Sequence, residues 1–246
     1  YKRQALIHLD RVSDLQRLEV HDDHLLIGAA RTYADCLAAL EEFPGVGALL
    51  ERLGSLQIRQ RGTLGGNIAN ASPIGDMPPV LLALDAQLRL RRAGAVREVA
   101  IDGFFTGYRQ TILQPGEYIE ALRIPRLRGH QRLRVDKVSK RRDDDISAVC
   151  LALRLDLDEA GIVADARLAC GGMAATPLRG AKTEAALRGR PFDAAAVAAE
   201  QAAIALDFQP IDDLRASAAY RLKVAQNLLQ RALLEGSECP AEVRHA

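Results

Sequence analysis

The stretch over residues 62–76 (GTLGGNIANASPIGD) is the part of the sequence best suited to ligand binding, with four glycines, two asparagines and two hydroxyl residues in fifteen positions. Glycine has no Cβ, so backbone N–H groups in this stretch can approach and surround an anion such as a pyrophosphate. Thr63, Asn67 and Asn70 can add side-chain hydrogen bonds, and Asp76 can accept one from a ribose or an adenine. The alternative is a long buried turn without a ligand. The density of polar residues favours a ligand-binding loop.

Neither of the common phosphate-binding motifs describes this stretch. The order Gly62-x-x-Gly65-Gly66 lacks the G-x-G-x-x-G spacing, and no Lys-Ser/Thr pair follows it as in a Walker motif. These observations exclude the Rossmann and P-loop interpretations and leave a nucleotide site of another kind.

A second candidate is the charged segment over residues 137–145 (KVSKRRDDD), in which four cations precede three acids near the end of an expected strand. The charge pattern alone favours a solvated surface loop, because mixed charges cost little at a surface. Three adjacent aspartates also need not bind a metal. The sharper alternative is a row of cations beside a flavin or a dinucleotide.

Other reactive side chains carry weaker signals. His21 and His24 are three residues apart, and no third ligand follows at metal-binding spacing, so we expect an exposed hairpin turn. The sequence has four cysteines: Cys36, Cys150, Cys170 and Cys239. Their spacing includes no C-x-x-C pair, which argues against an iron–sulfur ligand set and against a disulfide framework. No nucleophile elbow or zinc-protease motif is present.

The elements that would hold these candidates form an α/β pattern in the first half of the chain. Alternating and apolar runs predict strands over residues 5–9, 17–21, 25–29, 87–92, 96–100 and 117–124. A helix capped by Thr32 and a second helix over residues 48–53, ended by Gly54, are expected between them. We expect residues 62–70 to form a loop, followed by a short helix after Pro78 and Pro79.

The second half of the chain has a different pattern. A basic, breaker-rich stretch over residues 125–129 (PRLRG) is the best internal boundary. Strands are predicted beyond it over residues 135–139, 146–155 and 162–170, with a hairpin loop between the last two. Helices are predicted over residues 182–187, 194–206 and 217–234. This order indicates a second α+β domain.

The composition limits the class of protein. Of the 246 residues, 26% are charged and 48% are hydrophobic, as in an ordinary globular protein of one large or two modest domains. A formal net charge of +1 and 4% aromatic residues argue against a nucleic-acid partner. No apolar run is long enough for a membrane span, and no signal peptide is apparent, so a cytoplasmic location is expected. The chain begins with Tyr1 and resembles a piece of a longer one.

Four motifs together resemble the flavoproteins of the molybdenum hydroxylase family, particularly the xanthine dehydrogenase branch. Residues 62–76 resemble the family's second flavin-binding loop, and residues 139–149 (SKRRDDDISAV), 171–177 (GGMAATP) and 215–221 (RASAAYR) match in order. The resemblance implies an α+β fold. Residues 1–126 would form a FAD-binding domain of the vanillyl-alcohol-oxidase (PCMH) type that lacks its N-terminal subdomain, with the family's first flavin loop preceding Tyr1. Residues 127–246 would form a C-terminal domain like that of CO dehydrogenase flavoproteins, with a small antiparallel sheet and helices.

The resemblance also implies which residues hold the FAD. The pyrophosphate and ribitol would lie against the second loop, and the adenosine near Asp76. The isoalloxazine ring would lie near the backbone of Ile119, and Lys137 would stabilise negative charge on the reduced ring. Leu53 stands where the family often has an aromatic residue over the flavin nucleotide. The implied cofactor-binding residues are Leu53, Thr63, Leu64, Gly65, Gly66, Asn67, Asn70, Asp76, Ile119 and Lys137.

The implied function is that of an electron-transfer component in a larger oxidoreductase. The FAD would accept electrons from iron–sulfur clusters and reduce NAD, while the clusters and molybdopterin would belong to partner domains or subunits. The parent enzyme would be xanthine dehydrogenase-like and act in purine catabolism. Two alternatives stay open. One is the flavin subunit of a relative that oxidises CO, an aldehyde or an aromatic acyl-CoA, and the other is a flavin-free docking module.

Overall fold

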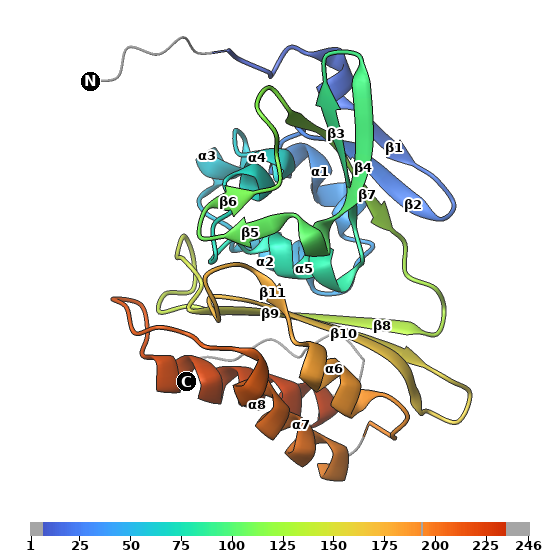
Figure 1. Cartoon of the computed structure of the whole chain (residues 1–246), viewed down its shortest axis with the longest axis vertical. Coiled ribbons are helices and arrows are strands. Elements are labelled where there is room, and N and C mark those ends of the chain that lie inside the picture. The colour runs from blue at the N-terminus through green and yellow to red at the C-terminus, as the bar shows by residue number, and fades with distance from the viewer. Residues whose placement is uncertain (1–6, 193, 235–246) are drawn as a thin grey trace.

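The computed structural model describes residues 7–192 and 194–234, which form two antiparallel sheets with helices on them (Figure 1). The first sheet has five strands in the order β1-β2-β7-β3-β4. These strands are β1 (Leu18–Val20), β2 (His24–Gly28), β3 (Gln87–Arg92), β4 (Ala95–Ala100) and β7 (Tyr118–Pro125). The short strands β5 (Phe105–Gly107) and β6 (Gln110–Thr111) form a separate ribbon, and 3-10 turns occupy Ser13–Gln16 and Ile101–Gly103.

Five short helices lie in the first half of the chain: α1 (Tyr33–Leu40), α2 (Val46–Glu51), α3 (Leu56–Arg59), α4 (Leu64–Ala69) and α5 (Met77–Ala83). The side chain of Thr32 caps α1 by accepting a hydrogen bond from the Asp35 N–H at 3.2 Å. Buried residues of α1, α2, α4 and α5 share one apolar core with the first sheet. The helices therefore cover one face of that sheet (Figure 1).

The second sheet has four strands in the order β11-β10-β9-β8. They are β8 (Gln131–Val138), β9 (Val149–Leu157), β10 (Val163–Gly171) and β11 (Leu178–Arg179). Helices α6 (Ala181–Leu187), α7 (Ala194–Asp207) and α8 (Ala218–Leu234) lie on the face turned away from the first half of the chain (Figure 1).

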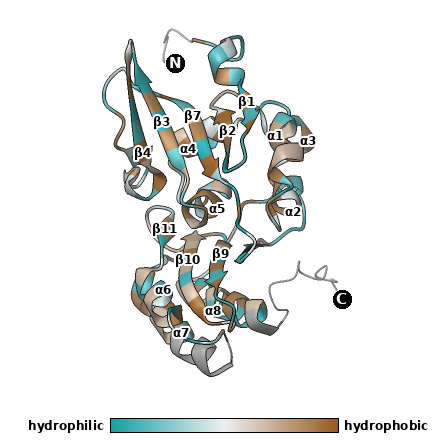
Figure 2. Cartoon of the chain, turned by 90° about the vertical axis from the view of Figure 1, so that its right-hand side faces the viewer, coloured by the Kyte–Doolittle hydropathy of each residue, from teal (hydrophilic) through white to brown (hydrophobic). Residues whose placement is uncertain are grey.

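Helix α5 lies between the first sheet and the second sheet and so joins the two halves of the chain (Figure 2). Every residue of α5 is buried, and the helix contacts both β9 and β10. Strand β9 alternates accordingly. Val149 and Leu151 pack with α7 and α8, whereas Cys150 and Ala152 belong to the core that contains α5. Both faces of the second sheet are thus covered by helices.

The structure confirms the predicted α+β architecture and most of the predicted elements. One exception is the strand expected over residues 5–9, because residues 7–9 have no regular structure and residues 5 and 6 lie outside the described part. The other is the expected loop over residues 62–70, most of which is helix α4. Thr63 caps this helix and thereby supplies the start signal that outweighs the low helix propensity of two glycines.

Within residues 7–192 and 194–234, none of the helices is both long enough and apolar enough to cross a membrane.

Candidate functional site

The N-terminal end of α4 forms one wall of a cavity of about 670 Å³. Four of the ten predicted cofactor-binding residues line this cavity: Thr63, Gly65, Gly66 and Ile119. The Thr63 hydroxyl accepts a hydrogen bond from the Gly66 N–H at 3.0 Å. Residues that follow β2 and residues before and within β7 add to the lining. The cavity volume lies within the usual range for small-molecule sites, about 300–1,000 Å³.

The two adjacent glycines keep this end of α4 close to its neighbours. A Cβ at Gly65 would stand 2.5 Å from the Cβ of Ala29 and 2.6 Å from the Ala29 carbonyl oxygen, so a larger residue would push α4 away from β2. A Cβ at Gly66 would stand 2.8 Å from the capping hydroxyl of Thr63, on the exposed side of the helix. The wall of the cavity is therefore bare backbone, which suits close approach of a phosphate group.

Two buried polar atoms near α4 have no hydrogen-bond partner among the described residues. They are the Asn67 side-chain oxygen and the Tyr33 hydroxyl. Burial, and then the negative charge of Asp76, raise the pKa of the Tyr33 phenol, which stays protonated. A buried polar atom without a partner is costly, so these atoms have capacity for water or a ligand. Together with the glycine wall, they make the region compatible with a bound FAD.

Asp76 and Lys137 meet at the junction between the two halves of the chain. The Lys137 Nζ atom donates to Asp76 Oδ2 at 2.7 Å, and the two side chains are only 2% and 8% exposed. The Ser147 hydroxyl donates to the other Asp76 oxygen at 2.5 Å. Asp76 directly precedes α5, whereas Lys137 lies on β8. This buried ion pair therefore ties the end of the glycine-rich stretch to the second sheet.

Further contacts from the second half hold the same stretch. The Gly172 N–H donates to the Pro73 carbonyl at 2.7 Å, and Gly172 has a φ of +80°, a conformation that favours glycine. The Cys150 thiol lies 3.5 Å from the Asp76 carbonyl oxygen. Residues 73–76 are thus positioned by the sheet of the second half. The motif over residues 171–177 owes its two glycines in part to this approach.

The six remaining predicted residues do not line the cavity, and they lie in different surroundings. Leu64 is buried in the core, Leu53 is half-buried against it, and Asn70 is exposed at the end of α4. The others are Asn67, Asp76 and Lys137, described above. Four residues of the sequence-derived set therefore form a cavity group, Asp76 and Lys137 form a second, buried group, and the other four belong to neither. Their roles toward FAD stay predictions.

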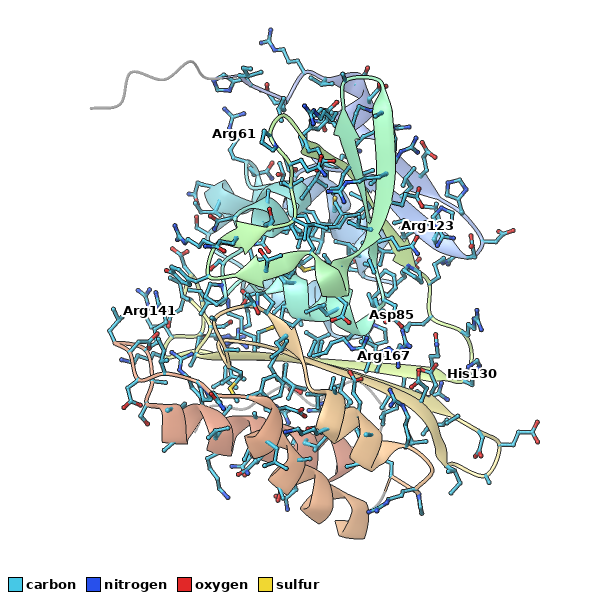
Figure 3. All side chains as sticks on the ribbon, in the orientation of Figure 1. Arg61, Asp85, Arg123, His130, Arg141 and Arg167 are labelled. Atoms are coloured by element: carbon cyan, nitrogen blue, oxygen red, sulfur yellow. The ribbon has the colours of Figure 1, made fainter. Side chains whose placement is uncertain are left out.

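Arg52, which no pattern in the sequence singles out, joins the second group. Its guanidinium donates to the carbonyl oxygens of Lys137 and Arg142 at 3.0 Å each, and to the Ser139 hydroxyl at 3.2 Å. The charged segment after β8 is therefore partly anchored rather than freely solvated. No local signal in the sequence distinguishes Arg52 from a surface arginine at a helix end. Figure 3 shows Arg141 of the same segment at one end of the second sheet, pointing away from the body of the protein.

The weaker candidates carry no site in the described part of the chain. The rings of His21 and His24 stack with centroids 4.4 Å apart and pair with Glu19 and Asp23. Among residues 7–192 and 194–234, no group of three or more His, Cys, Asp or Glu side chains is arranged to hold a metal ion. Cys36, Cys150 and Cys170 are buried free thiols. Cys239 lies outside the described residues.

Comparison with known proteins gives two family matches. Residues 1–127 match the FAD binding domain in molybdopterin dehydrogenase, and residues 134–236 match the CO dehydrogenase flavoprotein C-terminal domain. The chain is 35% identical to a xanthine dehydrogenase of Emericella nidulans over 218 residues, which are 83% of this chain and 16% of that protein.

Shorter relatives match over most of their length. A glyceraldehyde dehydrogenase medium chain of Sulfolobus acidocaldarius is 29% identical over 233 residues, covering 94% of this chain and 82% of the relative. A chain in the structure of carbon monoxide dehydrogenase from Hydrogenophaga pseudoflava has a TM-score of 0.84 at 28% identity, covering 91% of this chain and 78% of that one. A quinoline 2-oxidoreductase from Pseudomonas putida gives a TM-score of 0.83 at 25% identity, covering 93% and 80%.

Proposed function

Because the chain belongs to the family of FAD-binding domains in molybdopterin dehydrogenases, we propose that it is the FAD-binding electron-transfer component of a molybdenum hydroxylase. The observation that carries this proposal is the cavity at the start of α4. Its volume suits a small-molecule ligand, and its lining includes Thr63, Gly65, Gly66 and Ile119. The unpartnered oxygen of Asn67 nearby adds capacity for a ligand hydrogen bond.

In this proposal, bound FAD supplies the ability to take up electrons from one donor and to pass a hydride to another. The chain's own residues bind and orient it. The backbone at Gly65 and Gly66 receives the pyrophosphate, and Asn67 offers a polar partner. Lys137 would contribute its ammonium from the buried ion pair with Asp76, in a region that excludes water and where electrostatic effects are strong.

The finer proposal concerns the electron donor and acceptor. We propose that iron–sulfur clusters in partner domains reduce the FAD and that NAD accepts the electrons, as in a xanthine dehydrogenase-like enzyme. The support is the resemblance of residues 139–149 to that branch, together with the 35% identity to the Emericella nidulans enzyme. The substrate would be set by the molybdenum partner, so a CO- or aldehyde-oxidising parent is the alternative, supported by the medium-chain relatives.

The test uses the full-length protein purified with its partners. We expect about one FAD per chain by absorbance after release, and we expect NADH to bleach the flavin under anaerobic conditions. FAD without bleaching by NADH would refute NAD as acceptor while keeping the flavoprotein assignment. Absence of FAD would refute the assignment itself. Bleaching by xanthine, an aldehyde or CO in separate samples would then identify the substrate class.

A flavin-free docking module is the second candidate, and the charges of the cavity favour it. Asp10, Asp35 and Glu117 line the cavity together with a single cation, Arg61. The Arg97 guanidinium, followed by the Gln114 N–H, holds the pKa of Glu117 at about 2, so this carboxylate is charged at neutral pH. Carboxylates oppose a pyrophosphate, although the bidentate pairing with Arg97 offsets the charge of Glu117. The same FAD measurement decides between the two candidates.

A further inference from the structure

We propose that Arg52 is the positioning residue for Lys137 and for the charged segment that follows β8, a role that rests on the proposed flavin function. Arg52 and Lys137 contact each other twice. The Arg52 Nη1 atom donates to the Lys137 carbonyl at 3.0 Å, and the Lys137 Nζ atom donates to the Arg52 carbonyl at 3.1 Å. The two residues are 85 positions apart in the sequence.

These reciprocal contacts fix both ends of Lys137. Asp76 and the Arg52 carbonyl take two of the three N–H groups of the ammonium, and the Arg52 guanidinium holds the main chain from which the side chain starts. The third N–H has no observed acceptor among the described residues, and in this proposal it is the one that faces a bound ring. Arg52 therefore determines where this N–H points without itself touching the ring.

The remaining donors of Arg52 hold the charged segment. Its Nη2 and Nε atoms donate to Ser139 Oγ and to the Arg142 carbonyl, while Ser139 Oγ donates to the Arg141 carbonyl at 2.7 Å. One planar guanidinium thus binds acceptors from residue 137 to residue 142. From residue 139 onward, this segment no longer has the regular hydrogen bonding of the sheet. A lysine could not replace it, because an ammonium lacks the fork that reaches three acceptors.

Arg59 is a matched control. It is half-buried like Arg52, and its Nη1 atom donates to two main-chain carbonyls, those of Glu51 and Gly54, at 2.9 and 2.7 Å. It does not line the cavity and has no hydrogen bond to residues 137–142 among those observed. Arg59→Gln therefore removes an equivalent local clamp near α2 while leaving Lys137 in place.

The experiment uses the full-length protein with its partners and measures the flavin reduction potential. We expect Arg52→Gln and Arg52→Lys each to lower the ratio of reduced to oxidised flavin at fixed potential about tenfold, which is about 30 mV for the two-electron couple. Arg59→Gln should leave the potential unchanged. In a Lys137→Met background, Arg52→Gln should produce no further shift, because its effect passes through Lys137.

Three outcomes would overturn the proposal: an unchanged potential in Arg52→Gln, a wild-type potential in Arg52→Lys, or an undiminished Arg52→Gln shift in the Lys137→Met background. A second readout needs no flavin. In apoprotein, trypsin should cleave after Arg141 at least tenfold faster in Arg52→Gln than in Arg59→Gln, and equal rates would refute the clamp. Absence of flavin from the wild-type protein would refute the proposed function, whereas this proteolysis result would still decide the position of the segment.

Discussion

Ion pairs tie both ends of helix α5 to the second sheet, but the two ends differ in the number of ion pairs and in how far the carboxylate is exposed. Asp76 at the first end has one cationic partner, Lys137, and the pair is almost completely buried. Asp85 beyond the other end has three guanidinium partners, at 3.0, 3.0 and 3.8 Å, and its side chain is 39% exposed. Those partners are Arg154, Arg167 and Arg179. Figure 3 shows Asp85 and Arg167 side by side at the junction of the two halves.

The number of ion pairs is a poor guide to which end matters more. Asp85 is the exposed member of its cluster, so water and salt screen its charge, and its most buried partner, Arg154, keeps Asp156 as a second acceptor. Each pair of Asp85 should therefore contribute about 1 kcal/mol or less. At the buried end, loss of one partner leaves the other charged and desolvated. The single pair at Asp76 should therefore control both stability and the position of residues 73–76. The end of α5 next to the proposed cofactor site therefore relies on a buried pair, whereas the other end relies on a carboxylate that water reaches.

The largest effect is expected for Asp76→Asn. The substitution leaves Lys137 buried without a carboxylate, and we expect the free energy of unfolding to fall by about 3–5 kcal/mol. Asp85→Asn is the matched control, with an expected loss of about 1 kcal/mol or less. Asn suits position 85 because the native φ is +53°, a conformation that Asn and Asp tolerate. Chemical denaturation of both variants is the measurement, and equal losses would contradict the comparison.

The second prediction is a coupling energy between the two partners of the buried pair, which is measured by replacing both of them. Lys137→Met combined with Asp76→Asn removes the unpaired charge that makes each single substitution costly. We expect a coupling of about 2–3 kcal/mol, so that the double variant loses that much less stability than the sum of the two single losses. FAD retention should stay weakened, because the cation is gone. Additive losses would show that the two side chains do not act as a pair.

The third effect concerns salt. Asp85→Asn should differ from wild type in low salt, and the difference should vanish at about 1 M salt, where the Debye length is about 3 Å. The difference between Asp76→Asn and wild type should persist, since no ions reach the buried pair. The measurement is the unfolding free energy of the three proteins at both salt concentrations. If the stability loss of Asp85→Asn did not change with salt, the ion pairs of Asp85 would be as well shielded from ions as the pair at Asp76.

The sequence predicted the elements better than the contacts between them. Strand β2 and the helix capped by Thr32 follow from local patterns, because alternation and capping act over a few residues. Helix α4 was wrongly expected to be a loop. Glycine propensity argued against a helix there, whereas packing of Gly65 on Ala29 and the Thr63 cap favour one.

The candidate site shows the same limit. Residues 62–76 and Lys137 were found separately, but the pairing of Asp76 with Lys137 spans 61 positions and depends on how α5 lies on the second sheet. Arg52 had no signal of its own, because its importance comes from carbonyl groups 85 and 90 positions away. Local rules cannot reveal such contacts until the fold brings the segments together.

The smallest expected effect is on the thiol beside Asp76. Burial, and then the negative charge of Asp76, raise the pKa of Cys150 well above its ordinary value, so the native thiol should react very slowly with iodoacetamide. Asp76→Asn removes that charge, which lowers the pKa of Cys150 and should speed alkylation severalfold. Cys170 is the control, because burial and then Asp207 raise its pKa. Faster alkylation of both thiols would indicate general loosening, whereas faster alkylation of Cys150 alone would locate the buried charge at the first end of α5.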